Sequence, residues 1–516
     1  MTRIETIATW AASLSATDVP ADVLELCRAQ RRSVLGGMAA SSGDAAARRV
    51  LAGLDATTGD GAEAALYAGC VLSIALDFDD YVCFGHTGHT AVLAPLYLAG
   101  ETGASGDQQL VAQVVANEAE ARLGGACLIG PLNGQLWSFI HAAGTALAAG
   151  RLLGLGPGGL AHALAIALYQ APRPTVPGFM APDTKLLTAA EPAMIGLRAA
   201  RLAAAGVTGP LDLLDHRQGF LDAFADAPLP AMLGGLGEAW ATRTLCVKPY
   251  PGCAYVDTTV DALLELGPPA AGDVESVTVE AGMLTCAMDA LSRGYAGADP
   301  PTAVTINFSV PWTVAATLLG GELTPHQFRA DWLAAHRGEL GGLASRVSVV
   351  HDAALTRAAA AQFTRVVPPR AVVRDAGWSR LRRGLRRARG HQPSVGSARD
   401  AAAMLRPGGI RLGGRFWHPA AVDGFVMTFP ARVRVRLRDG RELVGQCDVP
   451  RGGAGHPTHP PGAVAREKLL TWGPELWGDE GTATIDAAID SDDDRLSELV
   501  RSGASGRGPR TRAATR

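Results

Sequence analysis

A run of acidic residues followed by two histidines is the part of the sequence best suited to acid–base chemistry. Asp77, Asp79 and Asp80 follow an apolar stretch, and His86 and His89 come soon after in a glycine-flanked loop. Carboxylates at the carboxyl end of a helix oppose the helix dipole, so helix stability does not account for them. A histidine near a carboxylate is suited to general acid–base work, because its unperturbed pKa lies near neutrality. The same pattern is equally typical of a solvated helix end with a polar loop.

Two lysines stand in settings suited to holding an anionic substrate. Lys248 precedes a segment that Pro249 and Pro251 keep extended, and Gly252 then lets the chain turn into a helix. An ammonium at this rigid position could be directed at a substrate carboxylate. Lys185 stands alone in a mostly apolar stretch, where a partly buried ammonium needs an anionic partner. A surface lysine ahead of a linker is the alternative reading of Lys248.

Other patterns in the sequence do not indicate a metal site, an anion-binding site or a serine hydrolase site. His456 and His459 are spaced like metal ligands, but the neighbouring prolines and the missing carboxylate partners favour a solvated loop without a metal. Six arginines lie within 380–389, and such a run is more typical of a solvated face than of an anion site. The sequence has no Gly-x-Ser-x-Gly elbow of a serine hydrolase.

Composition and charge limit the class of protein. The 516 residues, of which 47% are hydrophobic, exceed what one core usually serves and indicate two domains. A formal net charge of -3 argues against a general nucleic-acid-binding protein. The apolar stretches are short and the first residues do not have the pattern of a signal peptide, so we expect no membrane association. Eight scattered cysteines without a Cys-x-x-Cys pair indicate a reduced, cytoplasmic setting.

Most of the chain up to about residue 266 has the pattern of helices. Asp18 and Pro20 are typical of a helix start, as a capping carboxylate and a first-turn proline. Abundant alanine and glycine with few aromatics favour helices that pack closely. We therefore expect residues 1–266 to form the first part of a helical domain. Its later helices are expected at Ala62–Asp77, Asp107–Leu123, His141–Leu155, Leu160–Tyr169 and Ala193–Ala205.

A second, α+β domain is expected over residues 267–449, so the expected fold class is mainly α with an α+β second domain. Val274–Glu280 and Ala344–Val350 alternate like strands. The segment 431–444 is typical of a hairpin, with Asp439-Gly440 as its two-residue turn.

Three further segments complete the expected organisation. Residues 357–419 are rich in arginine, glycine and proline and are expected to be a less ordered insertion in the second domain. A helix near Ala463–Trp472 should return the chain to the helical domain within 450–501. The small, polar and basic tail 502–516 is expected to be disordered.

The acidic run with its histidines, and the Lys248-Pro-Tyr-Pro-Gly-Cys segment, resemble blocks of the MmgE/PrpD family of 2-methylcitrate dehydratase and cis-aconitate decarboxylase. The order of the similar segments extends over most of the chain. The resemblance implies a large helical domain built from both chain ends, a smaller α+β lid and a homodimer. It also implies small di- or tricarboxylate substrates, no metal or organic cofactor, and β-elimination, decarboxylation or epimerisation beside a carboxylate.

The resemblance also implies roles for individual residues. Asp77 and His86 match the family's aspartate and loop histidine, and Lys185 and Lys248 match its two lysines. His86 would be the general acid or base, Asp77 the carboxylate that orients it, and the lysines clamps for substrate carboxylates. The substrate site would also be lined by Tyr81, Gln135, Cys253 and Tyr255.

Several positions depart from the family pattern. Gln135 stands where relatives have a second histidine, and glutamine cannot transfer a proton at neutral pH. Thr188 and Asp257 also replace family histidines, and Tyr81 stands where many relatives have threonine. His141 is near Gln135 in sequence but is expected to face elsewhere.

These departures leave three functions open. The first is a lyase of the dehydratase or decarboxylase type with a diverged active site. The second is an epimerase, isomerase or cyclase of a specialised biosynthetic pathway, for which one base at His86 would suffice. The third is a binding protein that retains the fold without turnover.

Overall fold

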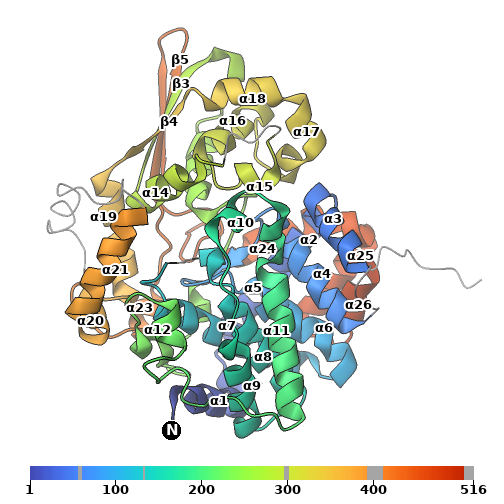
Figure 1. Ribbon diagram of the computed structural model, residues 1–516. Helices are drawn as coiled ribbons and strands as arrows, with labels where there is room; N and C mark the ends of the chain where they lie inside the picture. The colour runs from blue at the N-terminus through green and yellow to red at the C-terminus, as the bar shows by residue number, and fades with distance from the viewer. Residues whose placement is uncertain (56–60, 132–133, 296–300, 392–410, 505–516) are drawn as a thin grey trace, which may run out of the picture.

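The computed structural model of the protein describes residues 1–55, 61–131, 134–295, 301–391 and 411–504. Its helices form a large body, and a four-stranded sheet with further helices stands at one end of that body (Figure 1). The predicted class, mainly α with an α+β second part, is confirmed. Within the described ranges, no helix is both long and apolar enough to cross a membrane.

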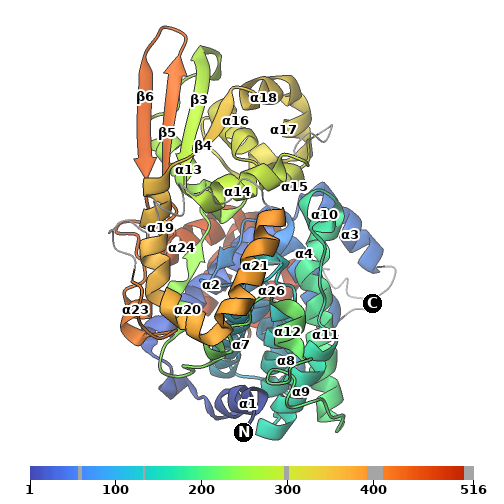
Figure 2. The same cartoon turned by 60° about the vertical axis from the view of Figure 1, so that its left-hand side comes forward.

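Helices from opposite ends of the chain pack together in the body. α2 (Ala21–Ala40) lies against α24 (Pro461–Trp472), as the predicted return of the chain requires. α25 (Pro474–Asp490) and α26 (Leu496–Ala504) lie in the same body (Figures 1 and 2). The contact between α2 and α24 is close at Gly36, where a Cβ would come 2.8 Å from Lys468 Cγ. α24 therefore brings a C-terminal lysine among N-terminal helices.

The start of α2 differs from the prediction. Pro20 occupies the N-cap position and provides no side-chain cap. Asp18 instead lies in a short 3-10 turn, η1 (Ala16–Asp18), where its carboxylate accepts hydrogen bonds from the backbone nitrogen and the hydroxyl of Ser15. A serine three residues before Asp18 competes for its carboxylate, and the local turn satisfies that carboxylate before α2 begins.

The centre of the body is a set of closely packed helices with small side chains at their contacts. α7 (Gly106–Ala126), α8 (Phe139–Leu152) and α11 (Leu187–Ala204) are almost wholly buried along their contacts. At Gly196 a Cβ would come 2.7 Å from Thr145 Cβ. The surrounding helices are α1 (Arg3–Ser13), α3 (Ala45–Asp55), α4 (Ala62–Ala75), α5 (Gly88–Ala91), α6 (Leu93–Thr102), α9 (Pro157–Tyr169), α10 (Val176–Met180), α12 (Phe220–Phe224) and α13 (Asp257–Glu265).

The sheet has the strand order β4-β3-β5-β6. β3 (Val274–Ala281) runs parallel to β4 (Val347–His351) and antiparallel to β5 (Ala431–Leu437), which pairs antiparallel with β6 (Glu442–Cys447). β5 buries its valines and leucine on one face. The parallel strands are joined through α14 (Met283–Ser292), α15 (Ala303–Ile306), α16 (Val310–Gly320), α17 (Ala330–Ala335) and α18 (Arg337–Ala344).

The hairpin between β5 and β6 is present, but its turn is longer than predicted. Leu437 pairs with Arg441 through a backbone hydrogen bond of 2.8 Å, so three residues form the loop. Gly440 has φ +88°, in the left-handed region that a three-residue loop requires at this position. An Asp-Gly pair serves both two- and three-residue loops, and the strand register decides between them.

The arginine-rich segment is more regular than predicted over the part that the structure describes. It forms α19 (Ala353–Val366), α20 (Pro369–Ala376), α21 (Trp378–His391) and α23 (Pro419–Asp423). Buried residues Ala371, Leu381 and Trp417 join the hydrophobic core of the helical body. Trp417 Nε1 donates to the Met232 carbonyl at 2.7 Å. Residues 392–410, and 505–516 of the tail for which disorder was predicted, lie outside the described residues.

Candidate active site

A tight turn after α4 arranges the acidic run. α4 ends at Ala75, two residues earlier than predicted, and Asp77 adopts the left-handed conformation with φ 52°. Its backbone nitrogen still bonds to the Ile74 carbonyl at 3.1 Å, so the helix ends in a turn that continues directly into Asp79 and Asp80. Asp77, Asp79 and Asp80 are all buried. The solvated helix end considered for this segment is therefore wrong.

Two very short strands bring the acidic run beside the Lys248 segment. β1 (Asp80–Tyr81) pairs antiparallel with β2 (Cys246–Val247). Lys248 continues the pairing, because its backbone nitrogen donates to the Asp79 carbonyl at 3.1 Å. The Gly252 nitrogen donates to the Leu76 carbonyl at 3.1 Å. These main-chain bonds place the Lys248 side chain directly over the carboxylates.

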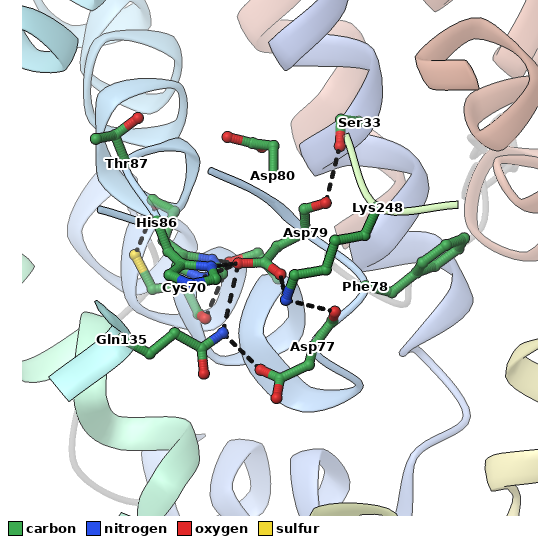
Figure 3. Close-up of polar contacts among 12 residues, drawn as sticks. Ser33, Cys70, Asp77, Phe78, Asp79, Asp80, His86, Thr87, Gln135 and Lys248 are labelled. Atoms are coloured by element: carbon green, nitrogen blue, oxygen red, sulfur yellow. Dashed lines mark hydrogen bonds and ion pairs between the residues drawn. The ribbon is translucent and has the colours of Figure 1, made fainter. Parts of the chain in front are cut away.

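Asp79 holds the two histidines of the loop. His86 Nδ1 lies 2.7 Å from Asp79 Oδ2 (Figure 3). His89 Nε2 lies 3.0 Å from the same oxygen. Burial would raise the pKa of Asp79, but Lys248 and His86 hold it well below its usual range. Burial lowers the pKa of His86 below its ordinary value, against the opposing pull of Asp79. His86 is therefore held as a neutral imidazole at neutral pH, with Nδ1 committed to Asp79.

Asp77 does not orient His86, contrary to the role expected for it. Its carboxylate forms an ion pair with Lys185 Nζ at 2.9 Å. The same carboxylate accepts a hydrogen bond from Gln135 Nε2 at 2.6 Å (Figure 3). The left-handed turn at Asp77 separates the two carboxylates, so that Asp79 takes the histidines and Asp77 takes Lys185 and Gln135. Because the three aspartates follow one another closely, their spacing alone could not assign these partners.

Both expected lysines are fully buried and already paired. Lys248 Nζ contacts Asp79 Oδ1 and donates to the Asp77 carbonyl at 2.9 Å. Lys185 Nζ bonds to Asp77 and, with the Asn307 amide oriented to satisfy its neighbours, donates to the Asn307 side-chain oxygen at 3.0 Å. Burial lowers the pKa of Lys248, but Asp79 and Asp77 outweigh that effect and keep it charged. An ammonium has three N–H donors, so each lysine retains one beyond these contacts.

The four residues expected to line the substrate site lie around this network. Gln135 bridges the aspartates through its amide nitrogen. The Tyr81 ring lies 5.8 Å from the His86 ring. The partly buried Cys253 packs beside the network, and burial raises the pKa of its thiol to about 12. Tyr255 turns its hydroxyl to the Phe308 carbonyl at 2.8 Å, so that group is occupied by the protein.

Lys468 is a component that the sequence did not indicate. Its ammonium donates to the carbonyls of Phe78 and Asp79, both at 3.3 Å, and to the Ser33 hydroxyl at 3.1 Å. Burial lowers its pKa to about 7. Burial and the charge of Asp79 raise the pKa of Asp80 to about 7. Lys468 belongs to the returning helix α24, so no motif near the acidic run could have revealed it.

His141 lies beside His89 and contacts Thr90 and Glu120. Its Nδ1 is 2.8 Å from the Thr90 hydroxyl, which donates to Glu120 at 2.9 Å. The His89 and His141 rings are 5.8 Å apart. His141 makes no direct contact with Asp77 or Lys185, consistent with the expectation that it faces elsewhere. Burial raises the pKa of Glu120 well above its usual range, which favours its uncharged form.

An apolar cluster covers Lys185. Leu136, Phe179, Met180 and Phe308 form one buried cluster, which Cys253 contacts. The Phe308 and Phe179 rings lie 5.0 Å and 5.9 Å from Lys185 Nζ. We define the apolar cover as Leu136, Phe179, Met180 and Phe308. It shields the ion pairs from water and strengthens them.

The geometry suits proton transfer beside an anionic group. A neutral imidazole is held by a carboxylate, and two ammonium groups lie on the same network. Among the residues that the structure describes, no group of three or more histidine, cysteine or acidic side chains is arranged to hold a metal ion.

Comparison with known families gives two matches. The MmgE/PrpD N-terminal domain matches residues 5–232, and the MmgE/PrpD C-terminal domain matches residues 250–400. The first match contains the acidic run, His86, Gln135 and Lys185, and the second contains Asn307 and the strands β3 and β4. No curated protein sequence matches the chain significantly.

Proposed function

Because the chain belongs to the MmgE/PrpD family, we propose that it is a lyase of the dehydratase or decarboxylase type that acts on a small di- or tricarboxylic acid. Proton abstraction next to a carboxylate is the step that its active site would catalyse. The general base is His86, oriented by Asp79, and the site is diverged at Gln135. The enzyme would use no organic cofactor or metal.

The state of His86 is the observation that carries this proposal. Asp79 engages Nδ1, which leaves Nε2 as the nitrogen able to accept a proton. His86 keeps 9% exposure while its neighbours Asp77 and Lys185 have none. A lowered pKa keeps the ring neutral at neutral pH, as a base must be. An oriented, neutral imidazole that is buried but keeps slight exposure is more than a binding protein requires.

Lys185 and Lys248 would supply the positive charge that the reaction needs. Abstraction of a proton beside a carboxylate places negative charge on that carboxylate. Each lysine retains one N–H for it, and both are held by aspartates and carbonyls in a dry site. Their role is therefore to stabilise developing charge as well as to bind the substrate.

Gln135 favours a second candidate, an epimerase, isomerase or cyclase that uses the same pocket. Its amide bonds to Asp77 at 2.6 Å, so it stabilises the network but offers no second proton. Removal and return of a proton by His86 alone would suffice for hydrogen exchange at carbon. A two-base elimination would need a further acid from the substrate or from water.

Proton NMR in D2O tests this proposal. Wild type and His86→Gln would each be incubated with 2-methylcitrate, citrate, cis-aconitate and amino-dicarboxylates. We expect loss of an α-proton signal or a new product with wild type, and at least a roughly 100-fold slower change with His86→Gln. A product that has lost water or CO2 indicates the lyase, whereas a product of unchanged composition, or exchange without net reaction, indicates the second candidate. Equal rates in both proteins, or silence with every acid, would leave the binding protein as the better reading.

The proposal includes a homodimer in the cytoplasm. None of the eight cysteines forms a disulfide, which is compatible with a reducing compartment. Sedimentation velocity would test the assembly, and a monomer at micromolar concentration would contradict it.

A further inference from the structure

Gln135 is held in one orientation, because its amide nitrogen faces two carboxylates. Nε2 lies 2.6 Å from Asp77 Oδ1 and 3.5 Å from Asp79 Oδ2. A reversed amide would place its oxygen against both carboxylates, which is electrostatically unfavourable. The Gln135 side-chain oxygen, Oε1, is therefore directed away from Asp79.

Two buried acceptors consequently lie without a donor. Gln135 Oε1 and Asp77 Oδ2 have no hydrogen-bond partner among the described residues. Asp77 is fully buried and Gln135 is 6% exposed. Figure 3 shows both oxygens on the same side, pointing away from Asp79. Buried acceptors are nearly always paired in native proteins, so this pair is arranged to receive hydrogen-bond donors from outside the chain.

The local lysines do not satisfy these two oxygens. Lys185 bonds to the other oxygen of Asp77, Oδ1, which also takes the Gln135 amide. Lys248 is occupied by the Asp79 carboxylate and the Asp77 carbonyl. The two lysines and the two aspartates are equal in number and opposite in formal charge, so together they sum to zero. At these two oxygens the network therefore offers unpaired acceptors and no net charge.

We propose that this acceptor pair binds an amino group of the substrate, so that the acid on which the enzyme acts is an amino-substituted dicarboxylate. A single amino nitrogen carries at least two N–H donors and can serve Gln135 Oε1 and Asp77 Oδ2 together, whereas a hydroxyl has one hydrogen and serves one of them. The ammonium also reduces the net negative charge that a neutral network must accept. This inference rests on the proposed function and specifies its substrate class.

Equilibrium binding of four matched acids tests the inference. Isothermal titration calorimetry would compare succinate, malate, aspartate and N,N-dimethylaspartate on wild type. N,N-dimethylaspartate keeps the positive charge of aspartate and has only one N–H. We expect aspartate to bind about tenfold more tightly than malate and N,N-dimethylaspartate, and succinate to bind most weakly. Equal affinity across the series, or no binding by any member, would overturn the inference.

Variants of Gln135 test whether this residue causes the preference for aspartate. Gln135→Met removes the acceptor at similar size and should reduce the advantage of aspartate to about twofold. Gln135→Asn, a smaller change, should reduce it as well, provided that circular dichroism shows the native fold. Gln109→Met is a matched control, because Gln109 in the first turns of α7 is also buried with an unpaired Oε1 but donates to the Ala104 carbonyl, away from the site. Retention of the preference in both Gln135 variants would refute the assignment.

The exchange experiment separates this inference from the proposed function. Selective binding of aspartate without His86-dependent exchange of any acid would contradict the lyase or epimerase and leave the amine site standing. His86-dependent exchange without selectivity for the amine would support the proposed function and refute the amine site.

Discussion

The residue that decides the chemistry is His86, and its properties come from one neighbour. Asp79 accepts from His86 Nδ1 and fixes the ring, while Lys248 keeps Asp79 ionised. The same aspartate also binds His89, so a single carboxylate supports both loop histidines. Buried charges are tolerated here because each is paired and hydrogen-bonded.

The pH dependence of His86 is a residue-scale prediction. The pKa of His86 is lowered, so base activity should rise with pH below the ordinary histidine value and be level at neutral pH. Asp79 raises that pKa, so Asp79→Asn should move the midpoint to still lower pH and reduce the plateau rate at least about tenfold. A ring-proton NMR titration, with His86→Gln to identify the signal, measures the midpoint without substrate. A midpoint that stays or rises in Asp79→Asn would contradict the assigned pair.

Asp80 provides a stability prediction with a defined sign. Its pKa in the folded protein is about 7, above its ordinary value of 3.8. The folded state therefore holds the proton more tightly, and stability is lost as pH rises from 3.8 through 7. Asp80→Asn cannot ionise and can still accept from Gln30. We expect it to gain about 1–3 kcal/mol relative to wild type between pH 4 and pH 8 in urea unfolding. If the free energy of unfolding of Asp80→Asn differed from that of wild type by the same amount at pH 4 and at pH 8, Asp80 would not be the titrating group.

At the scale of elements, short backbone segments position the aspartates and lysines of the site. The turn after α4 and the pair β1–β2 align the acidic run with Lys248. The returning helix α24 then holds the carbonyls of Phe78 and Asp79 through Lys468. The site therefore depends on how closely α2 and α24 approach.

Gly36 tests that dependence. In Gly36→Ala the new methyl would lie 2.8–2.9 Å from Lys468 Cγ and from the backbone of Lys468 and Leu469, so the helices must move apart. We expect a loss of about 1–3 kcal/mol in the free energy of unfolding. Gly462→Ala, in the first turn of α24 with no atom within 4 Å of the added methyl, is the control and should be neutral or slightly stabilising. Equal unfolding midpoints for the two variants would show that α2 and α24 do not need this contact.

At the scale of the whole molecule, the site lies where the helical body meets the part that carries the sheet. Asn307 and Phe308 come from the sequence between β3 and β4, yet they contact Lys185 of the body. The Cys253 nitrogen donates to the Asn307 carbonyl at 2.9 Å. The apolar cover packs against Lys185, so we expect relative movement of these parts to change access to the site.

Labelling of cysteines would measure that access. Cys253 is partly buried against the apolar cover, and its raised pKa makes the thiol unreactive. Phe179→Ala removes part of the cover, and we expect Cys253 to react with iodoacetamide at least about fivefold faster. Cys447, also partly buried but at the end of β6, should react at the wild-type rate and serves as the internal control. Mass spectrometry of the two peptides gives both rates. An unchanged Cys253 rate would show that Phe179 does not limit access.

The sequence by itself determined the family, the fold class and the identity of the main charged residues. Helical periodicity, alternation in the strands and the two motif blocks are local properties, so one chain suffices to read them. Asp77, His86, Lys185 and Lys248 were all predicted, and the structure brings them into one hydrogen-bonded network.

Only the tertiary structure decided how these groups are paired. Because of the left-handed turn at Asp77, His86 bonds to Asp79, although the sequence spacing allowed either aspartate. Lys468 contacts Asp79 from several hundred residues away and Asn307 contacts Lys185 from more than a hundred residues away, separations at which no local pattern carries information. The three-residue hairpin and the place of Asp18 were likewise set by register and by a competing partner. In a buried site, the hydrogen-bond and ion-pair partners of each group are the few polar groups that packing places next to it. Those neighbours are a property of the folded chain and not of the local sequence.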